Sequence, residues 1–446
     1  MPKTPDPEAS AQRREILRLA VPAFLALIAE PVFLLVDSAI VGYLGTASLA
    51  GLGVATAVLL STVGLFIFLA FGSTAVVARR SGAGDLRGAL AAGVDGMYLA
   101  ALLGVATAVV IFATAPPIVD FFNASPAASA EALTYLRISA FGIPAMLVVF
   151  AATGVLRGLQ DTRTPLIVAV AGFSANAVLS LTLVHGLSLG IAGAAWGSVV
   201  AQSSMAGALG AVVMRGARWH EASRSFQPGG VLVAALGGIP LLIRTLALRG
   251  VILATTWVAA GLGDADLAAF QVSITVWNLL VFALDALAIA GQAITGKYLG
   301  AGDLVRTRGA MAMMIRWGVW FGVLLTVLIL ALHQLIPLAF SADPQVRASI
   351  AAALVVLALQ QPFAAIAFVL DGVLMGAGDM WWLAIAQVVL ALAYLPMLYA
   401  VWATGVQGTA GLVWLWVAFS AFMAIRALVV WLRSRSEAWM VTGATR

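Results

Sequence analysis

Two acidic residues lie in the first apolar segment of the chain, in the stretch EPVFLLVDSAIVG. Glu30 and Asp37 are seven positions apart, so on a helix they share one face, about 10.5 Å apart along its axis. A carboxylate is unfavourable in apolar surroundings when charged, so it takes up a proton readily and can couple proton entry to the release of another ligand. The alternative is a structural acid, satisfied by a neighbouring hydroxyl or by reaching outward to water.

The elements that must position these acids are membrane-spanning helices. The chain is 63% hydrophobic and 10% charged, with a mean hydropathy of +1.06, which exceeds what one soluble core can bury. Its apolar runs are long enough to cross a hydrocarbon core about 30 Å thick, and they lack the alternation of membrane strands. The sequence therefore predicts an all-α integral membrane protein with twelve transmembrane helices. These are residues 15–43, 47–78, 87–113, 131–156, 164–185, 190–213, 231–260, 266–296, 308–332, 346–373, 380–403 and 409–432.

The basic residues predict the orientation of these helices. With a cytoplasmic N-terminus, 20 of the 24 Lys and Arg residues fall on the inner side, and the outer loop ATAPPIVDFFNASPAASAE has none. The sequence thus predicts a multi-pass protein of the cell (inner) membrane with both termini cytoplasmic. Because the charges are spread over short loops, we expect the lipid bilayer, and no nucleic acid, as their partner.

The residue types exclude several kinds of chemistry. The chain has no cysteine, its three histidines are scattered, and it lacks a G-x-x-x-x-G-K-[ST] phosphate loop. We therefore expect no enzyme, no metal site, no cofactor and no direct use of ATP.

An internal repeat divides the chain into two halves. GAGDL occurs at Gly82 and again 218 residues later at Gly300, and the same offset relates Pro144 to Pro362. The predicted regions are a cytoplasmic tail (1–14), an N-lobe (15–217), a cytoplasmic linker (218–230), a C-lobe (231–435) and a second tail (436–446). Six helices per lobe give two parallel repeats related by a pseudo-two-fold axis along the membrane normal. This arrangement is typical of secondary transporters, although channels and membrane enzymes also contain repeats.

Several polar and aromatic residues have no counterpart in the other half. Asp37 corresponds to Thr255, and Glu30 to Leu248. In the C-lobe, Arg244 and Asp285 fall at similar depth, which predicts a structural ion pair, with a cation or substrate role as the alternative. Asp371 completes the polar network predicted for this lobe, and Gln292 is a further polar candidate. Trp277 could line an aromatic cavity for organic cations, although core or lipid-facing packing is the simpler interpretation.

Four stretches, PVFLLVDSAIVGYLGTASLAGLGVA, LRGLQDTRTPL, LGIAGAAWGSVVAQ and LDGVLMGAGD, resemble the multidrug and toxic compound extrusion (MATE) family. Within that family the chain is most similar to the DNA-damage-inducible protein F (DinF)-like branch. The resemblance runs from about Arg13 to Arg435. It implies a two-lobed exporter that moves organic, often cationic or amphipathic, compounds outward in exchange for protons or sodium ions.

The resemblance also implies a cation-coupling cluster in the N-lobe. The acid of the family's first helix matches Asp37, and an Asn of its fifth helix matches Asn176. Ser180 stands where relatives have an Asp, and Ser198 where they have a Thr. Loss of the second acid weakens a sodium site, which needs several hard oxygen ligands, so we expect proton coupling. Phe33 replaces a Tyr found in some relatives, and it joins Glu30 among the residues that could contact substrate.

The sequence leaves three other functions open. These are a sodium-coupled exporter of the same family, a flippase for lipids or amphiphiles, and a channel or transport-inactive receptor. We expect small organic substrates and a monomeric chain.

Overall fold

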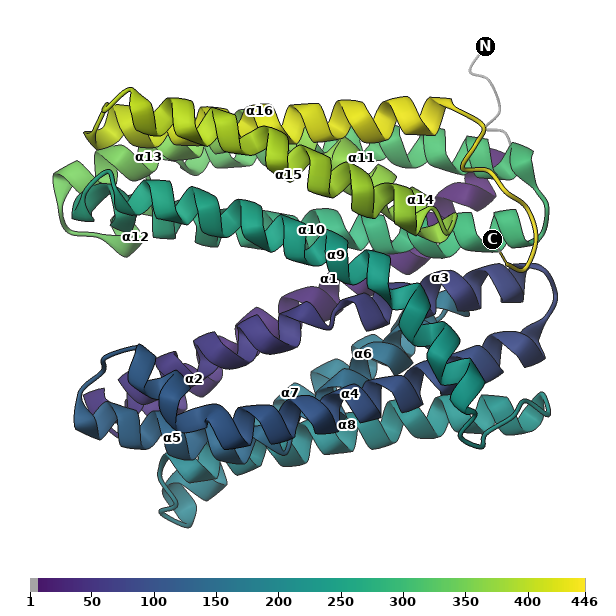
Figure 1. Cartoon of the computed structure of the whole chain (residues 1–446), viewed down its shortest axis with the longest axis horizontal. Coiled ribbons are helices and arrows are strands. Elements are labelled where there is room, and N and C mark those ends of the chain that lie inside the picture. The colour runs from purple at the N-terminus through teal and green to yellow at the C-terminus, as the bar shows by residue number, and fades with distance from the viewer. Residues whose placement is uncertain (1–6, 446) are drawn as a thin grey trace. The chain divides into compact units, whose positions relative to one another are not determined.

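The computed structural model describes residues 7–445, and in this range every regular element is helical (Figure 1). Residues 1–6 of the predicted N-terminal tail and Arg446 lie outside the described residues. The elements of the first half are α1 (Pro7–Gly42), α2 (Thr46–Leu65), α3 (Phe68–Gly82), α4 (Leu86–Phe121), α5 (Pro126–Ala140), α6 (Ile143–Gly158), α7 (Arg163–Leu181), the π-helix η1 (Thr182–Gly186) and α8 (Ile191–Trp219).

The second half follows the same order. Its elements are α9 (Pro228–Ala260), α10 (Asp264–Gly300), α11 (Leu304–Leu332), the short α12 (Ile336–Phe340), α13 (Pro344–Leu359), α14 (Gln361–Gly376), α15 (Met380–Ala403) and α16 (Gly408–Arg435). Ten helices of the described chain are long and apolar enough to span a membrane, and the number is twelve when each of two bent pairs is taken as one span. The all-α membrane class is thereby confirmed.

The two bent spans occur at equivalent positions of the repeat. α5 and α6 meet at 50°, and α13 and α14 meet at 52°. Pro144 and Pro362 stand at the first turn of the helix after each bend, where the missing N–H of proline removes no helical hydrogen bond. The spans predicted at residues 131–156 and 346–373 are therefore each built from two helices.

One predicted outer loop is mostly helical. The stretch ATAPPIVDFFNASPAASAE is predicted to lie outside the membrane spans, but α4 continues to Phe121 and α5 begins at Pro126. Pro116 and Pro117 lie inside α4. The apolar residues after these prolines continue the helix, so proline was a misleading signal of its end.

Close helix crossings recur with the 218-residue offset. A Cβ atom on Gly154 would lie 2.3 Å from the carbonyl oxygen of Ala70, and one on Gly372 would lie 2.1 Å from that of Ala288. These glycines let α6 approach α3, and α14 approach α10. Helices α4 and α6 pack together as α11 and α14 do, and α7 and α8 as α15 and α16 do. Each half therefore repeats one packing scheme.

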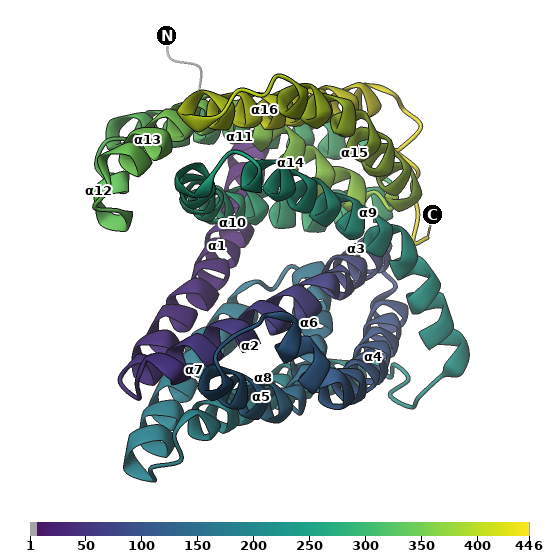
Figure 2. The same ribbon diagram turned by 60° about the vertical axis from the view of Figure 1, so that its left-hand side comes forward.

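The described chain forms two compact units. The N-terminal unit comprises Val21–Ile239 with Gly443–Thr445, and the C-terminal unit comprises Pro240–Thr442 with residues 7–20. Figures 1 and 2 show that helices within a unit run alongside one another. The units differ from the predicted lobes because the start of α1 belongs to the C-terminal unit, where Glu15 bonds to Lys297 and Tyr298 of α10.

The outward faces of the units are apolar. Large hydrophobic side chains such as Leu35 (72% exposed) and Trp320 (73% exposed) lie on helices of the predicted spans. Exposed apolar surface of this kind is stable in lipid and unfavourable in water. The core of the C-terminal unit, by contrast, is closed around Phe270, Trp416 and Phe419.

Candidate functional site

Asp37 is buried inside the N-terminal unit, with 3% of its surface exposed. It comes from α1, and its principal partner is Tyr135 of α5, whose Oη donates a hydrogen bond to Oδ2 over 3.3 Å. The other carboxyl oxygen, Oδ1, is also buried and has no hydrogen-bond partner among the described residues. No Lys or Arg of the described chain pairs with Asp37. The carboxyl group is therefore enclosed without a counter-ion.

Three predicted residues form a hydrogen-bonded chain in the same unit. Ser180 Oγ donates to Asn176 Oδ1 over 2.9 Å, and Asn176 Nδ2 donates to Ser198 Oγ over 3.2 Å. Asn176 and Ser180 are one turn apart on α7, and Ser198 faces them from α8. Each of the three is at most 6% exposed. Gly197 allows this approach, because a Cβ atom there would lie 2.7 Å from Ser180 Oγ.

Ser180 links this chain to the acid. Its hydroxyl interacts with the carboxyl of Asp37 as well as with Asn176, and Tyr135 interacts with Ser198 and Ser139 as well as with Asp37. A serine hydroxyl has one proton, and Ser180 donates it to Asn176 in this structure. The structure thus brings Asp37, Asn176, Ser180 and Ser198 together into one polar cluster, which we call the Asp37 cluster and which also includes Tyr135.

The equivalent place in the C-terminal unit is almost apolar. Thr255 replaces Asp37 and contacts Tyr394, the counterpart of Asn176, with 3.0 Å between the hydroxyl oxygens. The counterparts of Tyr135, Ser180 and Ser198 are Ala353, Leu398 and Trp416, all at most 3% exposed. The N-terminal unit therefore has a titratable carboxyl group at this position, and the C-terminal unit has mostly packed apolar side chains there.

Tyr135 was missed by the sequence analysis. It lies in an apolar helix and forms no short motif with Asp37, 98 residues earlier. The offset of 218 residues contained the signal, because Tyr135 corresponds to Ala353 just as Asp37 corresponds to Thr255.

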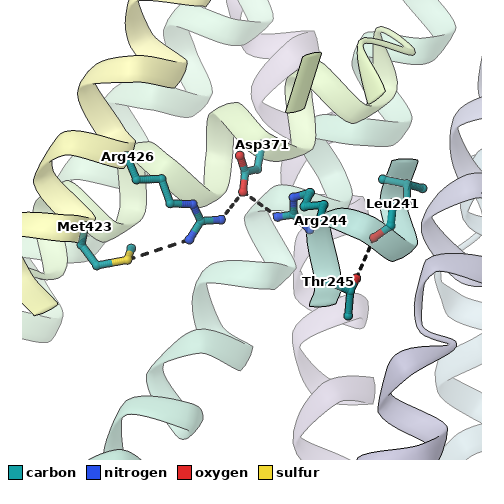
Figure 3. Close-up of polar contacts among 6 residues, drawn as sticks. All are labelled: Leu241, Arg244, Thr245, Asp371, Met423 and Arg426. Atoms are coloured by element: carbon teal, nitrogen blue, oxygen red, sulfur yellow. Dashed lines mark hydrogen bonds and ion pairs between the residues drawn. The ribbon is translucent and has the colours of Figure 1, made fainter. Parts of the chain in front are cut away.

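A second buried cluster lies in the C-terminal unit (Figure 3). Arg244 of α9 donates from Nη2 to Asp371 Oδ2 of α14 over 2.6 Å, and Arg426 of α16 binds the same oxygen. The sequence predicted Asp285, not Asp371, as the partner of Arg244. Counting residues from the helix ends gives the depth of a side chain but not the direction in which it points, which is why the partner was wrong. Asp285 instead interacts electrostatically with Arg426, a residue that was not among the predicted site residues.

The chemistry of this second cluster differs from that of the Asp37 cluster. Two guanidinium groups stabilise one carboxylate, whose side chain is 4% exposed, and Arg426 also stacks over Phe368 at 5.2 Å. Charges paired in this way stay ionised and hold three helices together.

The remaining candidates lie apart from these contacts. Phe33 stacks on Phe173 at 5.1 Å within the N-terminal unit, and Glu30 is half-buried. Trp277 belongs to the aromatic core of the C-terminal unit, where it packs against Phe419 at 5.4 Å. Gln292 is buried at the crossing of α10 and α14. Trp277 therefore packs in the core of the C-terminal unit and does not line an aromatic cavity.

Two repeated helical units with long apolar helices and buried polar clusters define a multi-span membrane protein with the architecture typical of secondary transporters. The sequence profile of the MatE family matches residues 22–182 and 240–400, which are the two halves of the repeat. The chain belongs to this family. Its members are transporters and not enzymes, as the sequence predicted.

Relatives and solved structures agree with this assignment. The chain is 29% identical over 458 residues to "Protein DETOXIFICATION 44, chloroplastic" of Arabidopsis thaliana, covering 98% of this chain and 85% of that protein. It is 29% identical over 300 residues to "DNA damage-inducible protein F" of Escherichia coli K12, covering 65% and 64%. The fold matches the Vibrio cholerae MATE transporter VcmN in the bent form with a TM-score of 0.86, 19% identity, and coverage of 96% and 97%. The predicted family is confirmed.

Proposed function

We propose that the protein exports small organic, often cationic or amphipathic, compounds in exchange for protons. Asp37 carries the proton, and Tyr135, Asn176, Ser180 and Ser198 hold its carboxyl group in place. Family membership supports the transport of small molecules across a membrane. The observation that carries the choice of coupling ion is the enclosed carboxyl group of Asp37, with one unsatisfied oxygen and no counter-ion.

The charge balance of the Asp37 cluster favours the proton over sodium. The hydrogen-bonded chain around the acid supplies an amide and hydroxyl groups but no second carboxylate. A sodium ion prefers several hard oxygen ligands that include negative charge, whereas a proton needs a single carboxyl oxygen. Sodium coupling is the second candidate, supported by the oxygen atoms that Asn176, Ser180 and Ser198 place beside Asp37.

Alternating access would convert proton binding into export. In one state Asp37 is protonated and neutral, which suits its enclosed position. When the proton leaves, the charged carboxylate requires water or a cationic ligand, so the two forms favour different conformations. A substrate and a proton that compete for such a site are exchanged across the membrane.

The distribution of basic residues supports an orientation with both termini in the cytoplasm. Bacterial relatives support placement in the cell (inner) membrane. A single chain contains both halves of the repeat, which supports a monomer as the transporting unit.

The function is tested with purified protein in liposomes that are free of sodium. An imposed pH jump should drive uphill movement of a cationic dye such as ethidium, and a panel that includes anionic compounds defines the substrate class. Lipid scrambling without dye movement would assign a flippase instead, and a sodium requirement would assign the second candidate.

A further inference from the structure

A basic cavity lies in the C-terminal unit, between the beginning of α1 and the end of α10. It has a volume of about 570 Å³ and is lined by Ser10, Ala11, Arg14, Glu15, Arg18 and Lys297. None of these residues belongs to either polar cluster described above. The cavity is large enough to hold a phosphate group and part of what the group is attached to.

The charges that line the cavity are predominantly positive. Among the described residues that line the cavity, three side chains are cationic and one is a carboxylate. The carboxylate of Glu15 is already engaged, because Lys297 Nζ lies 2.6 Å from Oε1 and Tyr298 Oη donates to Oε2 over 2.5 Å. Arg14 and Arg18 are exposed and lie one turn apart on α1, so their guanidinium groups can face a common anion.

The cavity also lies at the edge of the membrane-spanning region. Residues 10–18 of α1, SAQRREILR, are rich in charge and precede the apolar run of this helix, and the span of α10 ends at Gly300. Lipid headgroups occupy this level. Leu17, three residues after Arg14, is 47% exposed, so an apolar side chain is available beside the cavity for an acyl chain.

The repeat offers an internal comparison. The counterpart of Lys297 is Arg79, and in the N-terminal unit its guanidinium donates to the carbonyl oxygens of Gly443 and Thr445, over 3.0 Å and 3.3 Å from Nη2. There the C-terminal segment of the chain supplies the oxygen acceptors. Beside Lys297, Glu15 supplies a carboxylate, and the cavity with its excess positive charge adjoins it.

We propose that this cavity binds a phosphate group, as carried by an anionic phospholipid headgroup or by free phosphate. Arg14 and Arg18 bind the phosphate oxygens, and Lys297 supports them while it holds Glu15. The exposed Leu17 favours the lipid as the source. The proposal does not depend on which ion drives transport.

The test uses the full-length protein purified in detergent and measures lipid binding by native mass spectrometry. The probes are short-chain phosphatidylglycerol, zwitterionic phosphatidylcholine of the same chain length, and inorganic phosphate alone. We expect the double variant R14Q/R18Q to bind phosphatidylglycerol at least about tenfold more weakly than the wild type. The matched control is Arg13→Gln, which removes one charge from an exposed position of the same helix outside the cavity wall, and should change binding less than about twofold.

The outcomes distinguish a lipid headgroup from free phosphate as the ligand, and they also show when neither binds in the cavity. Arginine-dependent binding of phosphatidylglycerol in preference to phosphatidylcholine supports the lipid. Arginine-dependent binding of inorganic phosphate, with no gain from the lipid, supports free phosphate. Equal binding of both lipids without displacement by phosphate would overturn the proposal, as would equal losses in R14Q/R18Q and Arg13→Gln. Because the substituted side chains are exposed, all variants should fold.

Discussion

The substitution Asp37→Asn removes the one acid of the Asp37 cluster with little change of shape. Asn retains a carbonyl oxygen that can accept the hydrogen bond from Tyr135, which is 3.3 Å long in the wild type. A neutral amide also resembles the protonated carboxyl group, which is the form that suits the enclosed position. We therefore expect the thermal stability in detergent to change by no more than about 1 kcal/mol.

The loss of coupling should be large by comparison. A pH difference of one unit is worth about 1.4 kcal/mol per proton, which can sustain about a tenfold concentration ratio of an exchanged substrate. An Asn side chain does not exchange a proton in this range. The Asn variant should therefore sustain no concentration ratio of ethidium across the membrane.

The assay follows ethidium accumulation in liposomes with an imposed one-unit pH difference. Asp120→Asn is the matched control, since Asp120 is an exposed acid of the same unit and the chemical change is identical. This control should keep the wild-type ratio. An Asp37→Asn variant that still accumulates ethidium to that ratio would refute the role given to Asp37.

Three further substitutions test the surroundings. Tyr135→Phe removes the hydroxyl that donates to Asp37. Because one hydrogen bond is worth about 1 kcal/mol, we expect a rate of coupled export about fivefold lower. An unchanged rate would mean that the hydroxyl does not position the acid. Asp371→Asn leaves Arg244 and Arg426 without the carboxylate that they share. Thermal unfolding should show about 3–5 kcal/mol of destabilisation. A variant as stable as the wild type would contradict the structural role given to Asp371. Gly372→Ala places a Cβ 2.1 Å from the backbone of α10 and should lower stability by about 1–3 kcal/mol, whereas Gly53→Ala, with open space around it, should not.

The sequence predicts the architecture well because lipid restricts what a chain can form. Apolar runs of sufficient length must become helices, and the constant offset of 218 residues predicts that both halves pack alike. The matched crossings at Gly154 and Gly372 confirm this packing. Helix ends were less accurate, as the continuation of α4 through Pro116 and Pro117 shows, because proline is tolerated in apolar helices.

The sites were predicted in part. Asn176, Ser180 and Ser198 were identified through the family resemblance, and the structure places them with Asp37. Tyr135 escaped notice because contacts between distant helices depend on the direction in which each side chain points. The same limit explains why Asp285 was chosen over Asp371 as the partner of Arg244.

Proton exchange by the wild-type protein tests the central claim most directly. The measurement loads sodium-free liposomes with a pH-sensitive dye and adds ethidium on one side of the membrane. The account predicts that ethidium uptake is accompanied by proton movement in the opposite direction and that both fluxes are lost in Asp37→Asn. Ethidium uptake that requires sodium and moves no protons would contradict it.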